Sequence, residues 1–184
     1  LKKGFFMKRL KLFTLTTLFL LVFSNVANAN VTLLSSDDLV GVSFWITSMG
    51  MLAATLFFFF ERGSVAHNWR ITLTVAGIIT GVSFVNYVYI RNVWAVTGDL
   101  PILYRYIDWF ITVPLQVTQF YLILSTVRKV PKKLFWKLLV GSFTMLLGGY
   151  LGESRYIPAV AGFVIAIAGW IYILYEIYSG DAGI

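Results

Sequence analysis

The sequence predicts an all-α membrane protein, and three observations support this fold class. Hydrophobic residues make up 59% of the 184-residue chain and charged residues only 12%, with a mean hydropathy of +0.81. Apolar segments follow one another, each close to the ~20 residues that a helix needs to cross a hydrocarbon core. Their connections are short, so consecutive helices are expected to lie antiparallel and adjacent. This composition argues against a soluble globular domain.

The N-terminal segment, residues 7–29, has the pattern of a secretory signal peptide. A basic start, an apolar core and a small-residue cleavage site occupy residues 8–11, 12–23 and 27–29. The core is short for a membrane span, although an uncleaved first helix is the alternative. Residues 1–6 precede the expected start at Met7, and are either translated upstream sequence or a sign of a partial record.

Five membrane spans are predicted after this segment, at residues 39–60, 69–90, 100–127, 134–151 and 157–178. Pro101 and Pro131 suit helix starts, where a backbone N–H is not needed. Pro114 lies within the third span, where it removes a backbone hydrogen bond and predicts a kink. Glycines at spacings typical of close helix packing lie on the second and fourth spans, at Gly77, Gly81, Gly148 and Gly152.

Basic residues at the ends of the spans predict the orientation in a bacterial inner membrane. They gather in two connections, at Arg62, Arg70, Arg128, Lys129, Lys132, Lys133 and Lys137, whereas the opposite side holds Arg91 and Arg155. The positive-inside rule therefore puts these two connections in the cytoplasm and the mature N-terminus outside. Glu61 and Glu176 fall at cytoplasmic ends and are expected to be solvated.

Charge and composition also exclude several function classes. The net charge of +7 falls to +2 without Lys2, Lys3, Lys8, Arg9 and Lys11, so it does not indicate a nucleic-acid partner. The chain has no cysteine, which excludes disulfides and thiolate chemistry. Its single histidine, His67, cannot form a metal cluster alone, so no metal site is predicted.

A polar face on the third span is the feature that says most about function. Its members follow one another at helical spacing and fall within an arc of about 60°: Arg105, Asp108, Thr112, Gln116 and Gln119. Trp109 lies at the edge of this arc. Ionisable groups at membrane depth are costly, so they usually face the interior of a bundle and serve a function there. We therefore expect an internal pathway or ligand pocket beside this helix.

The segment RYIDW at residues 105–109, followed by TVPL at 112–115, resembles the third helix of the microbial rhodopsin family, and within it the proteorhodopsins. Further similar segments are GVSFW at 41–45, GGYLGE at 148–153 and GWIY at 169–172. The similarity extends over about residues 38–181. It implies a seven-helix bundle, of which five helices are present, that binds all-trans retinal as a protonated Schiff base and assembles into homo-oligomers.

The resemblance also implies roles for single residues. Asp108 matches the Schiff-base counterion and proton acceptor, Arg105 matches the arginine that tunes it, and Thr112 can hydrogen-bond to Asp108. Retinal-pocket positions are matched by Trp109, Thr112, Gln116, Met145, Gly149 and Trp170. Gln116 stands at the spectral-tuning position, where an amide is similar to the blue-absorbing members. Trp45 and Glu153 match family positions whose roles are less certain.

Three features depart from the family pattern. Gln119 stands where proton-pumping members carry a carboxylic acid, and an amide cannot return a proton, so we expect reprotonation from water and a slow photocycle. Asn86 stands where proteorhodopsins carry a histidine coupled to the counterion. The sequence ends after the fifth span with no lysine in mid-span for retinal, so we interpret it as part of a longer gene product.

The leading hypothesis is a retinal-binding, light-driven proton pump of the proteorhodopsin type rather than an enzyme, with the lipid bilayer and protons as its other partners. A slow-cycling sensory photoreceptor is the first alternative, because Gln119 favours a slow cycle. A non-photoactive, truncated membrane protein is the second. A sodium pump is disfavoured, since it would be expected to carry an acid in place of Thr112.

Overall fold

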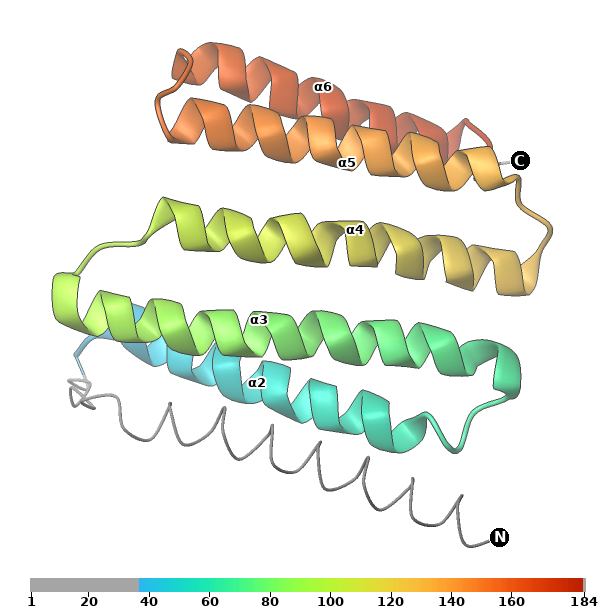
Figure 1. Ribbon diagram of the computed structural model, residues 1–184, viewed down its shortest axis with the longest axis horizontal. Helices are drawn as coiled ribbons and strands as arrows, with labels where there is room; N and C mark the ends of the chain where they lie inside the picture. Colours follow the sequence, from blue (N-terminus) through green and yellow to red (C-terminus); the bar gives the residue numbers. More distant parts are fainter. Residues whose placement is uncertain (1–36, 184) are drawn as a thin grey trace, which may run out of the picture. The chain divides into compact units, whose positions relative to one another are not determined.

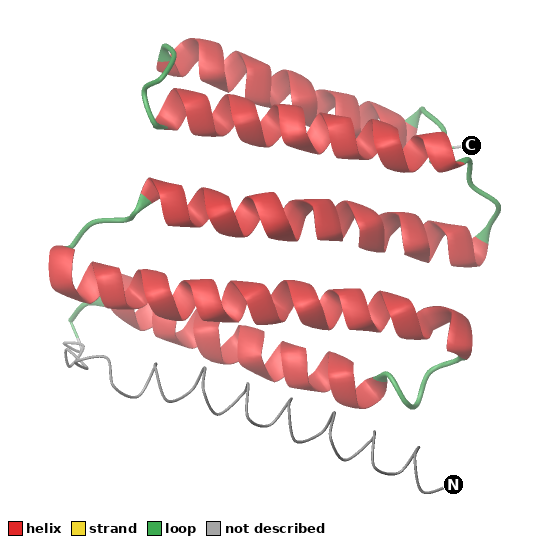
Figure 2. Cartoon of the chain, viewed as in Figure 1, coloured by secondary structure: helices red, strands yellow, loops and turns green. Residues whose placement is uncertain are grey.

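The computed structural model describes residues 37–183 of the chain. Its long helices are α2 (Leu39–Glu61), α3 (Arg70–Thr97), α4 (Ile102–Val127), α5 (Lys132–Glu153) and α6 (Ala159–Tyr178), with a short 3-10 helix, η1 (His67–Trp69), before α3 (Figure 1). All five are long and apolar enough to cross a membrane, which confirms the predicted fold class. Residues 37–183 contain no strand (Figure 2). The predicted signal peptide lies outside the described residues.

Consecutive helices run antiparallel and pack as neighbours, as their short connections require. The helices α2 and α3 form one close pair, and α5 and α6 form a second. Between them lies α4, which packs against α3 on one side and α5 on the other (Figure 1). It runs unbroken through Pro114, so the proline does not end the helix.

The helix α3 extends seven residues beyond its predicted end at Ile90. The apolar run stops at Arg91, but the indole N–H of Trp94 donates to both carboxylate oxygens of Asp38, at 3.2 and 3.0 Å, and ties the extension to the start of α2. The helix ends at Gly98, whose φ of 70° is the left-handed conformation that glycine adopts at little cost. Hydropathy marks where the apolar layer stops, and the helix continues past it.

Glycines bring the backbones of α5 and α6 into contact. A Cβ atom added to Gly162 would lie 2.5 Å from the Cα of Gly152, and one on Gly169 would lie 2.7 Å from the backbone nitrogen of Met145. A Cβ on Gly148 would lie 2.8 Å from the nitrogen of Ala166. Because backbone atoms cannot move aside, these positions require glycine, as expected for close helix packing. We call this contact the α5–α6 seam.

A charged network joins the start of α5 and the turn before it to the end of α6. The ammonium of Lys137 donates to Glu176 at 2.9 Å and forms an ion pair with Asp181 at 3.0 Å, and Lys133 forms an ion pair with Asp181 at 3.2 Å. The guanidinium of Arg128 donates to the carbonyl of Ala182. Glu176 is only 2% exposed, so the prediction that it is solvated was wrong: its position on α6 turns it toward Lys137. Hydrogen bonds from Lys137 and Lys133 lower the pKa of Asp181.

Candidate functional site: a cavity beside the polar face of α4

A cavity of about 510 Å³ lies beside the polar face of α4. Three members of that face line it, namely Asp108, Thr112 and Gln116, and Trp109 lies with them. The other helices contribute mostly apolar and aromatic side chains, at Met51, Ser83, Tyr87, Met145, Leu146, Gly149 and Ala166. The helical spacing in the sequence therefore predicted correctly that these α4 side chains share an internal space.

Asp108 is the buried acid of this cavity, with 4% of its surface exposed. The hydroxyl of Ser83 on α3 lies 3.3 and 3.4 Å from its two carboxylate oxygens. Among residues 37–183, no lysine, arginine or histidine forms an ion pair with it. A buried carboxylate is costly when ionised without a cation, so this position suits a positively charged ligand.

Thr112 is buried one turn along α4 from Asp108, as its spacing predicted. Its hydroxyl donates to the main-chain carbonyl of Asp108 at 2.9 Å rather than to the carboxylate. A threonine within a helix has the carbonyl four residues earlier within reach, and this local bond takes its hydrogen. The two side chains thus share the cavity wall without a hydrogen bond between them in this arrangement.

Arg105 is turned toward α5, where its guanidinium forms an ion pair with Glu153. It also lies 5.7 Å from the ring centroid of Trp109, within the range of a cation–π contact. The expected link between Arg105 and Asp108 is therefore not a direct ion pair. Glu153, whose role the sequence left open, is instead the partner of this arginine, because the start of α4 and the end of α5 lie side by side (Figure 1).

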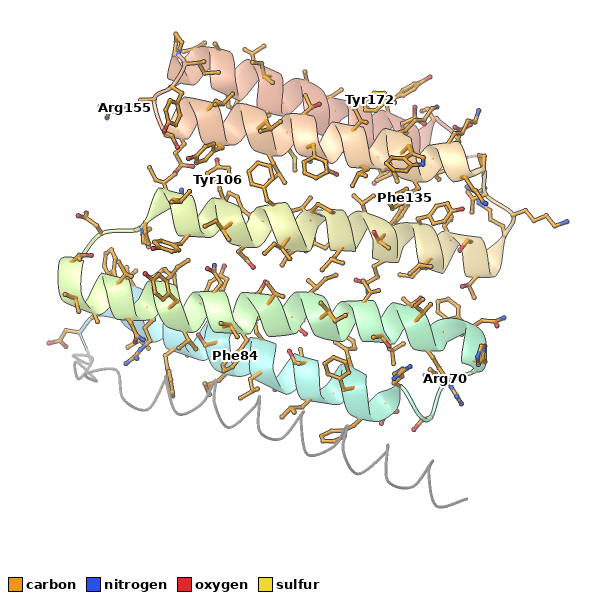
Figure 3. The ribbon with its side chains drawn as sticks, viewed as in Figure 1. Arg70, Phe84, Tyr106, Phe135, Arg155 and Tyr172 are labelled. Carbon is orange, nitrogen blue, oxygen red and sulfur yellow. The ribbon has the colours of Figure 1, made fainter. Side chains whose placement is uncertain are left out.

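Gly149 makes room for a side chain of the protein itself. A Cβ atom at this position would lie 2.9 Å from the hydroxyl oxygen of Tyr106. Tyr106 is buried between α4 and α5, edge-on to Trp109 and Tyr150 at centroid distances of 5.0 and 5.2 Å (Figure 3). Both Gly149 and Met145 line the cavity.

Three of the predicted site residues do not line this cavity, namely Arg105, Gln119 and Trp170. Trp170 on α6 is 48% exposed and does not line it; Ala166, one turn earlier, is the α6 residue that does. Gln119 is half-buried, one turn beyond Gln116, and is also absent from the lining. Asn86 lines a second cavity, of about 570 Å³, between α2, α3 and α4. Asp108 lines both cavities.

Sequence reasoning missed Ser83 and the cavity role of Tyr106. Ser83 had a signal that went unused: it is a polar residue on an apolar helix, one turn before Asn86 and on the same face. Tyr106 stands within the segment that carries the family resemblance, but nothing in the sequence indicated that its hydroxyl meets Gly149.

Comparison with known proteins gives a consistent result. The sequence model of the bacteriorhodopsin-like protein family matches residues 38–182. The blue-light absorbing proteorhodopsin of Gamma-proteobacterium Hot 75m4 is 53% identical over 148 residues, which are 80% of this chain and 59% of that protein. The green-light absorbing proteorhodopsin of Gamma-proteobacterium EBAC31A08 is 47% identical over the same share of each chain. The chain thus spans about three fifths of the length of these relatives.

Solved structures extend this similarity to the fold. The crystal structure of a blue light-absorbing proteorhodopsin from Med12 superposes with a TM-score of 0.69 at 48% identity, over 77% of this chain and 68% of the other. Xanthorhodopsin, described as a light-driven ion pump with dual chromophore, superposes with a TM-score of 0.66 at 28% identity, over 77% of this chain and 63% of the other.

Proposed function

The chain belongs to the bacteriorhodopsin-like protein family, and we propose that it carries the proton-acceptor site of a retinal-based, light-driven proton pump of the proteorhodopsin type. The observation that carries the proposal is the buried carboxylate of Asp108, which lines a cavity and pairs with no cation of the described residues. An ionised acid in this position gains most from a cationic ligand at the same depth.

The cavity has the character of a retinal site. Its volume of about 510 Å³ lies within the range of about 300–1,000 Å³ typical of small-molecule pockets, and its walls are largely apolar. Trp109, Met145 and Gly149 would flank the polyene, and Gln116 would lie beside it. All-trans retinal, attached as a protonated Schiff base to a lysine that these helices do not carry, would supply the cation and the light-driven change in its position.

The residues present account for the acceptor half of proton transport. Asp108, ionised in the resting state, takes up a proton, which removes its charge and that of the donor together. Thr112 fixes the helix beside it, and the Arg105–Glu153 pair stands one turn away, at the end of α4 predicted to face outward. Gln119 cannot supply a returning proton, so the return step takes its proton from water and is slow.

The slow return step is also what favours the alternative function, a sensory photoreceptor, because a slow cycle suits signalling better than flux. A non-photoactive membrane protein is the third hypothesis. We further propose that the protein lies in the bacterial inner membrane with its mature N-terminus outside, which the basic residues near the α4–α5 turn support, and that it forms homo-oligomers as family resemblance suggests.

The decisive experiment expresses the reading frame that contains this sequence with all-trans retinal and records the visible spectrum across pH. A matched version joins this chain to the part of its 53% identical relative that it does not cover. We expect a pigment that shifts to longer wavelength on acidification, a shift lost in Asp108→Asn, and acidification of the medium in light. A pigment without acidification would favour the sensor, and no pigment in either version would contradict retinal binding.

A further inference from the structure

The hydroxyl of Ser83 forms a different hydrogen bond from those of the other buried serines. Within a membrane helix, serine and threonine hydroxyls usually donate to a carbonyl of the preceding turn. Ser48 does so to Phe44 and Ser142 to Leu138, both at 2.8 Å. Ser83 instead donates across the helix interface to Asp108 on α4. Its hydrogen is thus used by the site rather than by its own helix.

The contact is buried and is shared between two acceptors. Ser83 is 7% exposed and Asp108 is 4% exposed. The hydroxyl oxygen lies 3.3 Å from one carboxylate oxygen and 3.4 Å from the other, a bifurcated arrangement in which each distance exceeds the roughly 2.7–2.8 Å of a single bond. Ser83 is also the only side chain among the described residues that hydrogen-bonds to this carboxylate.

We propose that Ser83 is a positioning residue for Asp108, which holds the carboxylate toward α3 and adapts to its protonation state. While Asp108 is ionised, the serine hydroxyl donates to it. When Asp108 is protonated, its O–H donates to the serine oxygen, and the serine hydrogen turns to the carbonyl of Ile79 on its own helix. Both side chains therefore keep a hydrogen-bond partner whether Asp108 is ionised or protonated. Ser83 changes only the direction of its hydrogen bond and does not itself gain or lose a proton.

This arrangement favours the ionised acid, because a hydrogen bond to a charged acceptor is stronger than one to a neutral group. The other titratable or charged side chains near Asp108 are Tyr87 and Tyr89 on α3, and Tyr104, Arg105 and Tyr106 on α4 itself. The charge of Arg105 is engaged with Glu153. The cavity lining contributed by α2, α5 and α6 has no titratable side chain. Asn86, on the same face of α3, does not titrate.

The test uses the protein in lipid, without retinal, and follows the infrared C=O band of protonated Asp108 as pH is lowered. The band is identified by its loss in Asp108→Asn. In Ser83→Ala we expect protonation to occur about one pH unit or more higher, with the band at higher frequency because its hydrogen-bond acceptor is gone. Ser83→Thr keeps the hydroxyl and is expected to restore most of both values.

Ser142→Ala is the matched control, because it deletes an equally buried serine hydroxyl that bonds only to its own helix. It should leave the Asp108 band where it is. If Ser83→Ala behaves like Ser142→Ala in both midpoint and frequency, Ser83 does not position the acid and the proposal is wrong. Should Ser83→Ala lose helical structure, the near-isosteric pair Ser83→Thr and Ser83→Val decides the question, because only the valine variant lacks the hydroxyl. The Asp108 midpoint should rise in Ser83→Val alone, and equal midpoints in the two variants would overturn the proposal.

The meaning of Ser83 for transport rests on the proposed function, but its contact with Asp108 does not. Because the infrared titration needs no pigment, a protein that binds no retinal can still show the Ser83 effect, and a pigment can form while Ser83→Ala changes nothing. The two proposals therefore fail separately. If a pigment forms, its colour titration should move with the infrared midpoint.

Discussion

The α5–α6 seam and the cavity face of α4 are two helix surfaces in the same bundle with opposite designs. At the seam, glycines let backbones touch, so that even one added methyl group at Gly162 has no space. On α4, a buried acid and an amide border about 510 Å³ of open volume. The seam is completed by the chain's own atoms, whereas the α4 face borders space that the described residues leave open. The difference teaches that tight packing and open space are assigned to separate helix faces, since α5 carries the seam on one face and Met145 and Gly149 of the cavity wall on another.

Asp108→Asn is expected to give the largest effect, which is a loss of light-driven acidification without a loss of stability. If Asp108 is the proton acceptor, as we propose, its loss should lower light-driven acidification by about a hundredfold or more. The free energy of unfolding should stay equal or rise, because the amide removes the cost of burying a charge. Light-driven pH change and unfolding in detergent measure the two quantities. Wild-type acidification by this variant would exclude Asp108 as the acceptor.

Gly162→Ala should show the reverse pattern, a loss of stability that precedes any loss of function. Its new Cβ would approach the Cα of Gly152 to 2.5 Å, so the helices must separate, and we expect a cost of about 2 kcal/mol or more in unfolding free energy. Gly50→Ala is the matched control, since nothing lies within 4 Å of that position on α2. It should stabilise the helix by about 0.5–1 kcal/mol. Equal effects at both sites would show that the seam is not tightly packed.

The contrast also explains which features the sequence could predict. The five spans and the shared face of Asp108, Thr112 and Gln116 depend on hydropathy and helical period, which are local. The pairing of Arg105 with Glu153 and the burial of Glu176 depend on how one helix is rotated against the next. No single-helix pattern contains that rotation. The extension of α3 depends on Trp94 reaching Asp38, which is 56 residues away.

Gly149→Ala tests the difference between the seam and the cavity within one helix. Gly149 lies on α5, as the seam glycines Gly148 and Gly152 do, but it faces the cavity rather than α6. Its Cβ would meet the Tyr106 hydroxyl at 2.9 Å, and the end of a side chain can move where a backbone cannot. We expect a cost of about 1 kcal/mol, well below that of Gly162→Ala. Tyr106→Phe should relieve it, so the double variant measured in the same unfolding assay should show coupling between the two changes. Additive effects would mean that Tyr106 does not fill this space.

The smallest effect is expected at the charged network around Asp181, outside both surfaces. Lys137 and Lys133 lower the pKa of Asp181, so the acid binds protons more weakly in the folded protein than in the unfolded chain. Its contribution to stability is therefore complete above the unfolded value of about 3.9 and is lost as pH falls through the lower folded value. Acidification should release the turn after α6, seen as a lower protection factor at the amide of Ala182, which bonds to the carbonyl of Glu176 at 3.2 Å. The protection factor is the exchange rate of an unfolded chain at the same pH divided by the observed rate.

Asp181→Asn is the control for this last effect, because it keeps the shape of the side chain and removes its titration. The protection factor of Ala182 should then be low at neutral pH already and should show no further fall in acid. The seam glycines and Asp108 should be unaffected, since the network ties only the end of α6 to the start of α5. An Ala182 amide that stays equally protected in Asp181→Asn would show that backbone bonds alone hold the turn, and that its ion pairs, like most exposed ones, contribute little.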